Sequence, residues 1–342
     1  MGLRCALPRL SFAALPLLLI VLSGCGSSPS SNSGGNTGSN SGTTGPLVSG
    51  GAASVYAIQN AGLNGNSYVL QFVAGANGAV SPTNTLTLPT GFSADGVAVD
   101  SSGQIYVCGL GVTQSQILVY PVGSSSPTRT INTPSNGAIT VDSAGLVYLA
   151  GNASVSVYSS TANGSAIPIR VITAPATQLA TGYPENLSVD STGSLYVATT
   201  NTAETSGNVL VFPPNANGNT NPTRTISLSN VPFGAVADSA GNIYVSENSA
   251  TGTPPAFIAE FSAGSTTPAK TITLSSTASQ IGGLEVDSVG NIYAIMYTGT
   301  VPSTTGTFSV IALGPTSTGT ISPTKQMTST ALSAGYTQIA IR

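Results

Sequence analysis

The sequence contains no histidine and no tryptophan, and only 6% of its residues are charged, against about 25% in ordinary soluble domains. Histidine is the commonest zinc ligand and general base in proteins, so its absence excludes the sites that depend on it. The 8 basic and 11 acidic residues give a net charge of −3. Such a chain lacks the basic face that nucleic acid requires, and we expect no nucleic-acid partner.

Long apolar runs are also scarce. The single clear one, Leu10 to Leu22, follows Arg4 and Arg9 and is too short for a confident membrane span. It ends in Leu22-Ser23-Gly24-Cys25, a quartet that resembles the bacterial lipobox, whose cysteine is lipidated. Residues 1–25 are therefore predicted to be a lipoprotein signal peptide with lipidated Cys25. An ordinary secretory signal that happens to contain a cysteine is the alternative.

The lipobox resemblance implies an exported protein that is anchored in the bacterial cell envelope by lipid on Cys25. Gly26, in place of an aspartate after that cysteine, implies the outer membrane if the host has one. Residues 26–50 are almost all serine, glycine, asparagine and threonine and predict a disordered linker, because they cannot bury a core. Residues 51–342 then form the folded domain. Its one cysteine, Cys108, has no partner for an internal disulfide and is expected to be a small buried apolar residue.

One motif runs through the folded region, Asp-Ser-x-Gly-(Asn/Gln/Ser/Leu)-(Ile/Val/Leu)-Tyr. It occurs at 100–106, 142–148, 190–196, 238–244 and 287–293, and its second half recurs at 54–56. The six tyrosines are 50, 42, 48, 48 and 49 residues apart. A period of this length indicates an all-β, six-bladed β-propeller with four-stranded antiparallel blades.

Each repeat contains four short β-patterned segments, which in the second unit are 96–100, 104–109, 116–120 and 128–131. The Asp-Ser-x-Gly that joins the first two has the residues of a tight turn, so we interpret the repeated aspartates as structural. The third segment ends in an aromatic residue in five units and in Ile311 in the last. Rings at fixed positions predict packing between blades, with a sugar-binding stripe as the alternative.

The two ends of the folded region are predicted to close the ring together. Residues 335–342 look like an innermost strand without its hairpin, and residues 53–60 look like a second strand without its innermost partner. The closing blade would then combine one C-terminal strand with three N-terminal strands. Such closure ties down both ends of the chain.

The fourth segment carries Pro-x-(Arg/Lys) in five units. Its basic residues are Arg129, Arg170, Arg224, Lys270 and Lys325, and the first unit has Asn84 instead. Proline and cations protect exposed edge strands against pairing with other chains, so we interpret these residues as edge protection. A ring of cations that binds an anionic surface polymer is the alternative.

The run Gly-Val-Ala-Val-Asp-Ser-Ser-Gly-Gln-Ile-Tyr-Val at 96–107 resembles the NHL repeat, and 234–247 resembles it again. NHL domains are six-bladed propellers, so the resemblance implies the same fold. Related peptide-amidating lyases and streptogramin lyases depend on histidine, which this chain lacks. Calcium-dependent lactonases of the gluconolactonase type use axial carboxylates and asparagines, but no motif of theirs aligns here residue by residue.

Three acids outside the repeated motif share one place in the repeat. Asp95 and Glu185 each lie five residues before a repeated aspartate, and Glu247 lies three residues after a repeated tyrosine. Because adjacent antiparallel strands begin and end at the same edge, all three are expected at one axial mouth of the propeller. The expected neighbours at this mouth are Asn60, Asn152, Tyr183, Asn201, Asn248 and Tyr297.

Carboxylates with asparagines could bind Ca²⁺, and two such acids could also act as general acid and base. The alternative is a set of solvated loop carboxylates too far apart to cooperate. The sequence thus favours a monomeric, non-enzymatic binding or scaffold protein whose partner is a surface protein or polysaccharide. The second hypothesis is a metal-dependent, calcium-type hydrolase, lactonase or lyase with Asp95, Glu185 and Glu247 at its mouth.

Overall fold

The structure is a computed structural model and describes residues 43–44, 54–60, 65–151, 153–173, 178–179, 182–249, 255–274, 278–298, 307–329, 331–332 and 338–342. The predicted signal peptide with Cys25, most of the predicted linker and Asn152 lie outside the described residues. Within the described part, no helix is long and apolar enough to cross a membrane.

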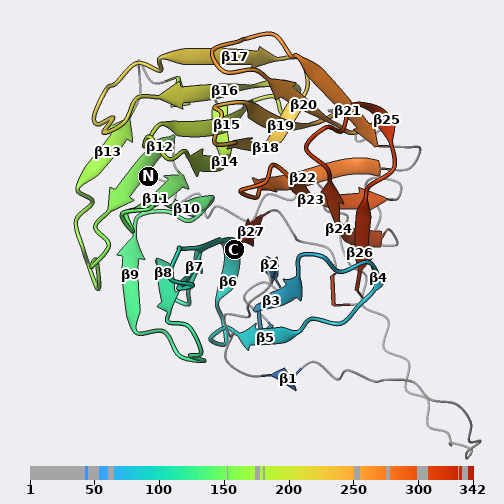
Figure 1. Cartoon of the computed structure of the whole chain (residues 1–342). Helices are drawn as coiled ribbons and strands as arrows, with labels where there is room; N and C mark the ends of the chain where they lie inside the picture. Colours follow the sequence, from blue (N-terminus) through green and yellow to red (C-terminus); the bar gives the residue numbers. More distant parts are fainter. Residues whose placement is uncertain are drawn as a thin grey trace, which may run out of the picture.

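The described strands form six sheets, each built on four antiparallel strands, and the sheets stand around a common centre as a ring (Figure 1). This confirms the predicted six-bladed β-propeller. From the centre outward, the first three blades consist of β27 (Ile339–Ile341), β2 (Ser54–Gln59), β3 (Tyr68–Val73) and β5 (Asn84–Thr87); β6 (Ser93–Val99), β7 (Ile105–Leu110), β8 (Ser115–Tyr120) and β9 (Arg129–Thr133); and β10 (Ile139–Val141), β11 (Val147–Gly151), β12 (Ser154–Tyr158) and β13 (Arg170–Thr173).

The other three blades follow the same order. They consist of β14 (Gly182–Val189), β15 (Leu195–Asn201), β16 (Gly207–Phe212) and β17 (Arg224–Leu228); β18 (Val231–Ala237), β19 (Ile243–Asn248), β20 (Phe257–Phe261) and β21 (Lys270–Leu274); and β22 (Ala278–Val286), β23 (Ile292–Thr298), β24 (Thr307–Leu313) and β26 (Lys325–Thr328). In the first blade, β27 pairs with β2 in antiparallel register, so strands from both ends of the folded region lie in one sheet.

Three short strands join the outer edges of blades in parallel orientation: β1 (Thr43–Thr44) pairs with β5, β4 (Gly78–Ala79) with β26, and β25 (Gly319–Ile321) with β21. β1 belongs to the segment for which a disordered linker is predicted. Its pairing with β5 gives two residues of that segment a defined partner.

The turn between the first two strands of a blade is held by the repeated aspartate. In the second blade, Asp100 Oδ1 accepts hydrogen bonds from the backbone N–H of Ser102 and of Gln104, both at 2.9 Å. Asp100 Oδ2 accepts a bond from the hydroxyl of Tyr106 at 3.1 Å, and Gly103 takes a φ of 88°. All five motifs repeat the aspartate–tyrosine bond, which agrees with a structural role for these carboxylates.

The core lies between blades. Each of six buried clusters contains one repeated tyrosine from one blade and a large side chain at or next to the end of the third strand of the next blade, as in Tyr106 with Tyr158 and Tyr148 with Phe212. In the last blade this position is taken by Leu313, which pairs with Ile292, rather than by Ile311. Large side chains at these two positions fill the gap that widens away from the axis.

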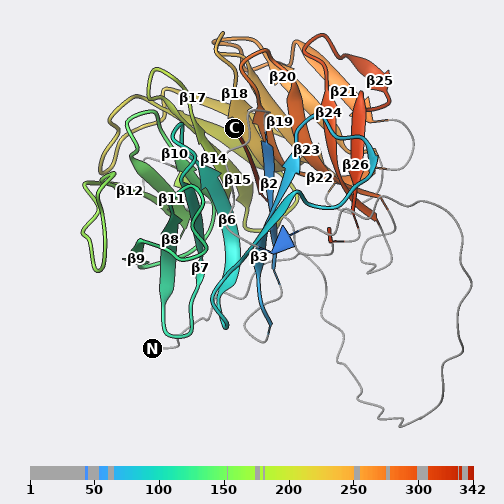
Figure 2. The same ribbon diagram turned by 60° about the horizontal axis from the view of Figure 1, so that its bottom comes forward.

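The inner strands are close-packed near the axis. A Cβ atom on Gly96 of β6 would come within 2.7 Å of the carbonyl oxygen of Gly137 in the next blade, so only glycine fits there. Figure 2, turned by 60° from Figure 1, shows β6 and β2 running side by side along the depth of the ring. The starts of the inner strands and the ends of the second strands therefore share one end of the ring, where the predicted site residues belong.

Candidate functional site

The strand register places the three predicted acids at the same level of their blades. Asp95 and Glu185 each occupy a β-bulge, between Ala94 and Gly96 in β6 and between Pro184 and Asn186 in β14. Glu247 of β19 lies opposite Pro232, next to the corresponding bulge of β18. A β-bulge interrupts the regular alternation of side chains between the two faces of a sheet. Asp95 and Glu185 are therefore not bound to the face that regular alternation would give them.

Asp95 is held by a short chain of polar groups that crosses to the third blade. Its Oδ2 accepts a hydrogen bond from Asn136 Nδ2, and Asn136 Oδ1 accepts one from Ser115 Oγ at 3.0 Å. Burial raises the pKa of Asp95 to about 6, although the bond from Asn136 opposes the shift. This carboxyl can therefore exchange a proton close to neutral pH.

Asp95 is half-buried, whereas Glu247 is buried, with 5% of its surface exposed. Its Oε2 accepts a hydrogen bond from Asn230 Nδ2 at 3.2 Å. Burial raises the pKa of Glu247, and the bond from Asn230 partly offsets that effect. Glu185, at its bulge in β14, is half-buried. The mouth thus has two acids, one half-buried and one buried, whose pKa values are raised by burial, and each has one asparagine as a neighbour.

Two of the predicted mouth asparagines connect blades. Asn248 binds the backbone of Ile281 in the next blade twice: its Nδ2 donates to the carbonyl at 2.8 Å, and its Oδ1 accepts the N–H at 2.7 Å. Asn60 Oδ1 accepts from Ser93 Oγ of the next blade at 3.2 Å and from Ser67 Oγ at 3.3 Å. These amides stabilise the ring.

The other predicted neighbours have local roles. Asn201 caps its own turn, with Oδ1 accepting from the N–H of Thr205 at 2.9 Å. Tyr297 is buried and packs on Phe308, with ring centroids 4.8 Å apart. Tyr183 lies on β14 opposite Thr200 and is half-buried. The mouth is therefore largely a packed and hydrogen-bonded rim.

In the part of the chain that the structure describes, no group of three or more histidine, cysteine, aspartate or glutamate residues could hold a metal ion. Asp95, Glu185 and Glu247 are all among the residues searched, so they share one end of the ring without forming such a group. A calcium ion there would need backbone carbonyls, asparagine oxygens or a ligand's own oxygens to complete its shell of 6–8 oxygens. Calcium binding stays a prediction.

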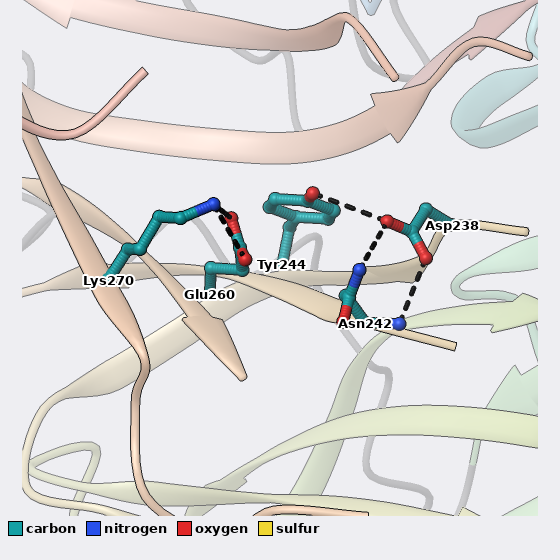
Figure 3. A network of polar contacts seen from close by, with 5 residues as sticks. All are labelled: Asp238, Asn242, Tyr244, Glu260 and Lys270. Carbon is teal, nitrogen blue, oxygen red and sulfur yellow. Dashed lines mark hydrogen bonds and ion pairs between the residues drawn. The ribbon is translucent and has the colours of Figure 1, made fainter. Parts of the chain in front are cut away.

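Two further acids, Glu260 and Glu285, lie on strands inside blades. Glu260 of β20 is buried and accepts two bonds of 3.0 Å from Lys270 Nζ. Figure 3 shows this pair beside the ring of Tyr244, whose hydroxyl donates to Asp238 Oδ2 at 3.3 Å. Glu285 of β22 lies opposite Tyr293, and burial raises its pKa to about 8.

Two cations of the fourth strands, Arg129 and Arg170, contact both their own blade and the next. Arg170 donates to Asn215 Oδ1 and to the hydroxyl of Tyr148, both at 3.0 Å, and its guanidinium lies 5.7 Å from the centre of the Tyr148 ring. Arg129 likewise lies over Tyr106, at 6.0 Å, and donates to the carbonyl of Ala162 at 3.0 Å. These cations therefore bind blades together, a role that the edge-protection interpretation did not include.

Sequence reasoning missed several polar contacts between blades. Asn136 and Asn230 bind Asp95 and Glu247, and neither asparagine belongs to a repeated motif. Three loops carry Ala-Asn-Gly, at 76–78, 162–164 and 216–218, and their asparagines accept backbone N–H bonds from the outer strand of the preceding blade. That tripeptide, which recurs at one place in the repeat, was the available signal.

Comparison with known proteins supports the fold. No protein-family model matches the chain, and no curated protein matches it. A protein of unknown function from Bacteroides caccae superposes with a TM-score of 0.58 at 11% identity, covering 85% of this chain and 99% of that one. A protein from Lactobacillus plantarum gives 0.51 at 13% identity over 81% and 82% of the two chains. Regucalcin, a calcium-binding protein from Agrobacterium tumefaciens, gives only 0.44 at 15% identity over 69% and 76%.

Proposed function

We propose that this chain is a non-enzymatic binding or scaffold propeller, held at a bacterial cell surface by lipid on Cys25. The observation that carries the proposal is the use of the mouth's polar side chains. Asn248 and Asn60 bind neighbouring blades, and Asn136 and Asn230 bind the two acids with raised pKa values. A rim whose polar groups already bind one another is suited to presenting a stable surface to a surface protein or a polysaccharide.

The test is a panel of lactone, glycan and peptide substrates. We expect no turnover by the full chain, with or without Ca²⁺. Reproducible hydrolysis that is lost in Glu247→Gln but kept in Glu204→Gln, a change in a surface turn, would overturn the proposal. Attachment through Cys25 is tested separately, by metabolic labelling with a fatty acid. The label should disappear in Cys25→Ser.

The second candidate function is a calcium-type hydrolase, lactonase or lyase at the same mouth. It is favoured by one observation, the two carboxylates at one end of the ring whose pKa values are raised by burial. Such groups are candidates for proton transfer near neutral pH. Calorimetric titration with Ca²⁺ discriminates the two functions, because the scaffold requires no ion. Binding that is lost in both Asp95→Asn and Glu247→Gln would favour the enzyme.

A further inference from the structure

The outer strands of four blades are paired by the loop that precedes the fourth strand of the next blade. We call these loop segments straps. Each strap places one glycine beside the middle of the outer strand in parallel orientation. The pairs are Ile131 with Gly164, Ile172 with Gly218, Ile272 with Gly319 and Met327 with Gly78. All four glycines have a positive φ, between 61° and 77°.

Loop length decides whether a strap exists. In the four blades that provide one, nine residues separate the large side chain at or next to the end of the third strand (Phe72, Tyr158, Phe212 or Leu313) from the repeated proline, as in 159–167 between Tyr158 and Pro168. In the second and fifth blades only six residues do so, 121–126 and 262–267. The shorter loop of the fifth blade folds on itself, with Ser265 Oγ donating to the carbonyl of Thr267 at 2.8 Å. It does not reach the preceding blade.

The two short loops leave two outer strands without a strap, β5 of the first blade and β17 of the fourth. β5 is paired instead by β1, from the segment that precedes the propeller. For β17, no described residue pairs with its outer edge. In Figure 1, β17 lies on the rim across the ring from β5 and β1.

The backbone groups on the free edge of β17 can be identified from the strapped strands. In β9, the N–H of Asn132 donates to Gly164 at 2.8 Å, and the carbonyl of Thr130 accepts from Gly164 at 2.7 Å. Arg129 of β9 pairs with Val119, and Arg224 of β17 pairs with Val211 at the same place in the repeat. Asn132 of β9 therefore corresponds to Ser227 of β17, and Thr130 corresponds to Thr225. No hydrogen bond from a described residue reaches the outward N–H of Ser227 or carbonyl of Thr225.

An unpaired strand edge of this kind accepts an added strand from another chain. From these relations we propose that the edge of β17 binds the serine- and glycine-rich segment 26–50 of a second copy of this chain, which we call the leader, through Asn36-Thr37-Gly38. This copy's own leader supplies the example, because Thr43 and Thr44 pair with the equivalent edge of β5 and are followed by Gly45 in the sequence. Thr37-Gly38 repeats the dipeptide of the strap at Thr318-Gly319.

Association of this kind is heterologous, because a leader on one copy meets an edge on another. The sequence predicts a monomer, and this proposal adds a weak, concentration-dependent equilibrium between the monomer and larger species. A strand of two or three residues makes few hydrogen bonds, each worth about 1 kcal/mol. The complex should therefore form mainly where copies are crowded, as on a shared membrane.

The test is sedimentation velocity of the full chain in mild detergent over a wide concentration range. Wild type should rise from monomer toward dimer and larger species. Ser227→Pro removes the outward N–H and should abolish association, while circular dichroism shows an unchanged fold. Thr273→Pro is the matched control, because Thr273 holds the same position on β21, an edge that β25 already covers. It should lower the melting temperature and leave association unchanged.

The leader is tested in the same way. Gly38→Pro should abolish association, and Gly34→Pro, in the same segment but outside the Thr-Gly pair, should not. A mixture of Ser227→Pro and Gly38→Pro copies should associate again, because the first supplies a leader and the second an intact β17 edge. A wild type that stays monomeric at all concentrations would overturn the proposal. So would association that survives Ser227→Pro, or that survives Gly38→Pro.

Discussion

Cys108 and Ser246 hold the same position in two blades, two residues after the repeated tyrosine, and each donates to a carbonyl oxygen of the next blade. Cys108 Sγ lies 2.7 Å from the oxygen of Gly137, and Ser246 Oγ lies 2.8 Å from that of Gly282. Thiol and hydroxyl therefore perform one task. The lone cysteine of the propeller is a contact between blades, which adds a hydrogen bond to the buried role expected from the sequence.

This equivalence predicts the effect of substitution. Cys108→Ser should keep the midpoint of urea unfolding nearly unchanged, since serine makes the same bond at the equivalent site. Cys108→Ala should lower the free energy of unfolding by about 1 kcal/mol, because it removes the donor to the partly buried carbonyl of Gly137. Burial also raises the pKa of the Cys108 thiol. Native protein at pH 7 should accordingly resist a thiol reagent that modifies the urea-unfolded chain. If Cys108→Ser and Cys108→Ala lower the free energy of unfolding equally, the hydrogen bond contributes nothing.

The repeated aspartate predicts a loss of stability in acid. Burial tends to raise the pKa of Asp190, but bonds from Thr192, from Tyr196 and from backbone N–H groups outweigh it and hold that pKa below its usual value. An aspartate with a depressed folded pKa stabilises the fold above the unfolded pKa of about 3.9, and this stability is lost as the pH falls through the folded pKa. The same direction applies to Asp100.

Melting temperature measured from pH 7 down to pH 2 tests this expectation. Asp190→Asn should reduce stability at pH 7 and show a shallower decline below pH 4 than wild type. Tyr196→Phe removes the donor that lies 2.8 Å from Asp190 Oδ2 and should have a smaller effect in the same direction. Parallel acid profiles for wild type and Asp190→Asn would mean that this carboxylate does not contribute to the pH dependence.

Asp95 should behave in the opposite way. Its pKa is raised to about 6 by burial, so the folded state holds the proton more tightly than the unfolded chain. Ionisation of Asp95 therefore costs stability as the pH rises from about 4 to 6, and the cost persists above that range. Asp95→Asn removes the charge and keeps an oxygen for Asn136. This variant should melt at a higher temperature than wild type at pH 7.5 and close to it at pH 4.

The same pair of proteins tests calcium. If the ion binds at the mouth, millimolar CaCl₂ should raise the melting temperature of wild type and not of Asp95→Asn. MgCl₂ at the same ionic strength is the control for screening. An equal response of both proteins to both salts would remove Asp95 from any calcium site.

The fold could be predicted from the sequence because one local sequence pattern recurs, in full or in part, in all six repeats. The turn at Asp100 is formed within one repeat, and Tyr106 packs at a position that every repeat shares. Both features can therefore be predicted from the motif. The straps could not be found in this way, because Gly164 meets Ile131 through a long-range contact between two units. The environment of the mouth acids depends on Asn136 and Asn230, which no periodicity marks. The pKa shifts of Asp95 and Glu247 come from burial, which the sequence does not specify.

The cations of the fourth strands should contribute to stability according to their contacts. Arg170 bridges two blades through Tyr148 and Asn215, whereas Lys325 is exposed and its side chain has no hydrogen bond or ion pair to a described residue. Arg170→Thr should lower the free energy of unfolding by about 1 kcal/mol, and Lys325→Thr should change it by less than about 0.5 kcal/mol. Both substitutions remove one positive charge from the same place in the repeat, so the difference isolates the contacts. If edge protection were the main role, the two variants would unfold alike and aggregate alike. Urea unfolding together with light scattering at high concentration separates these outcomes, because the contacts act on the unfolding midpoint and edge protection acts on aggregation.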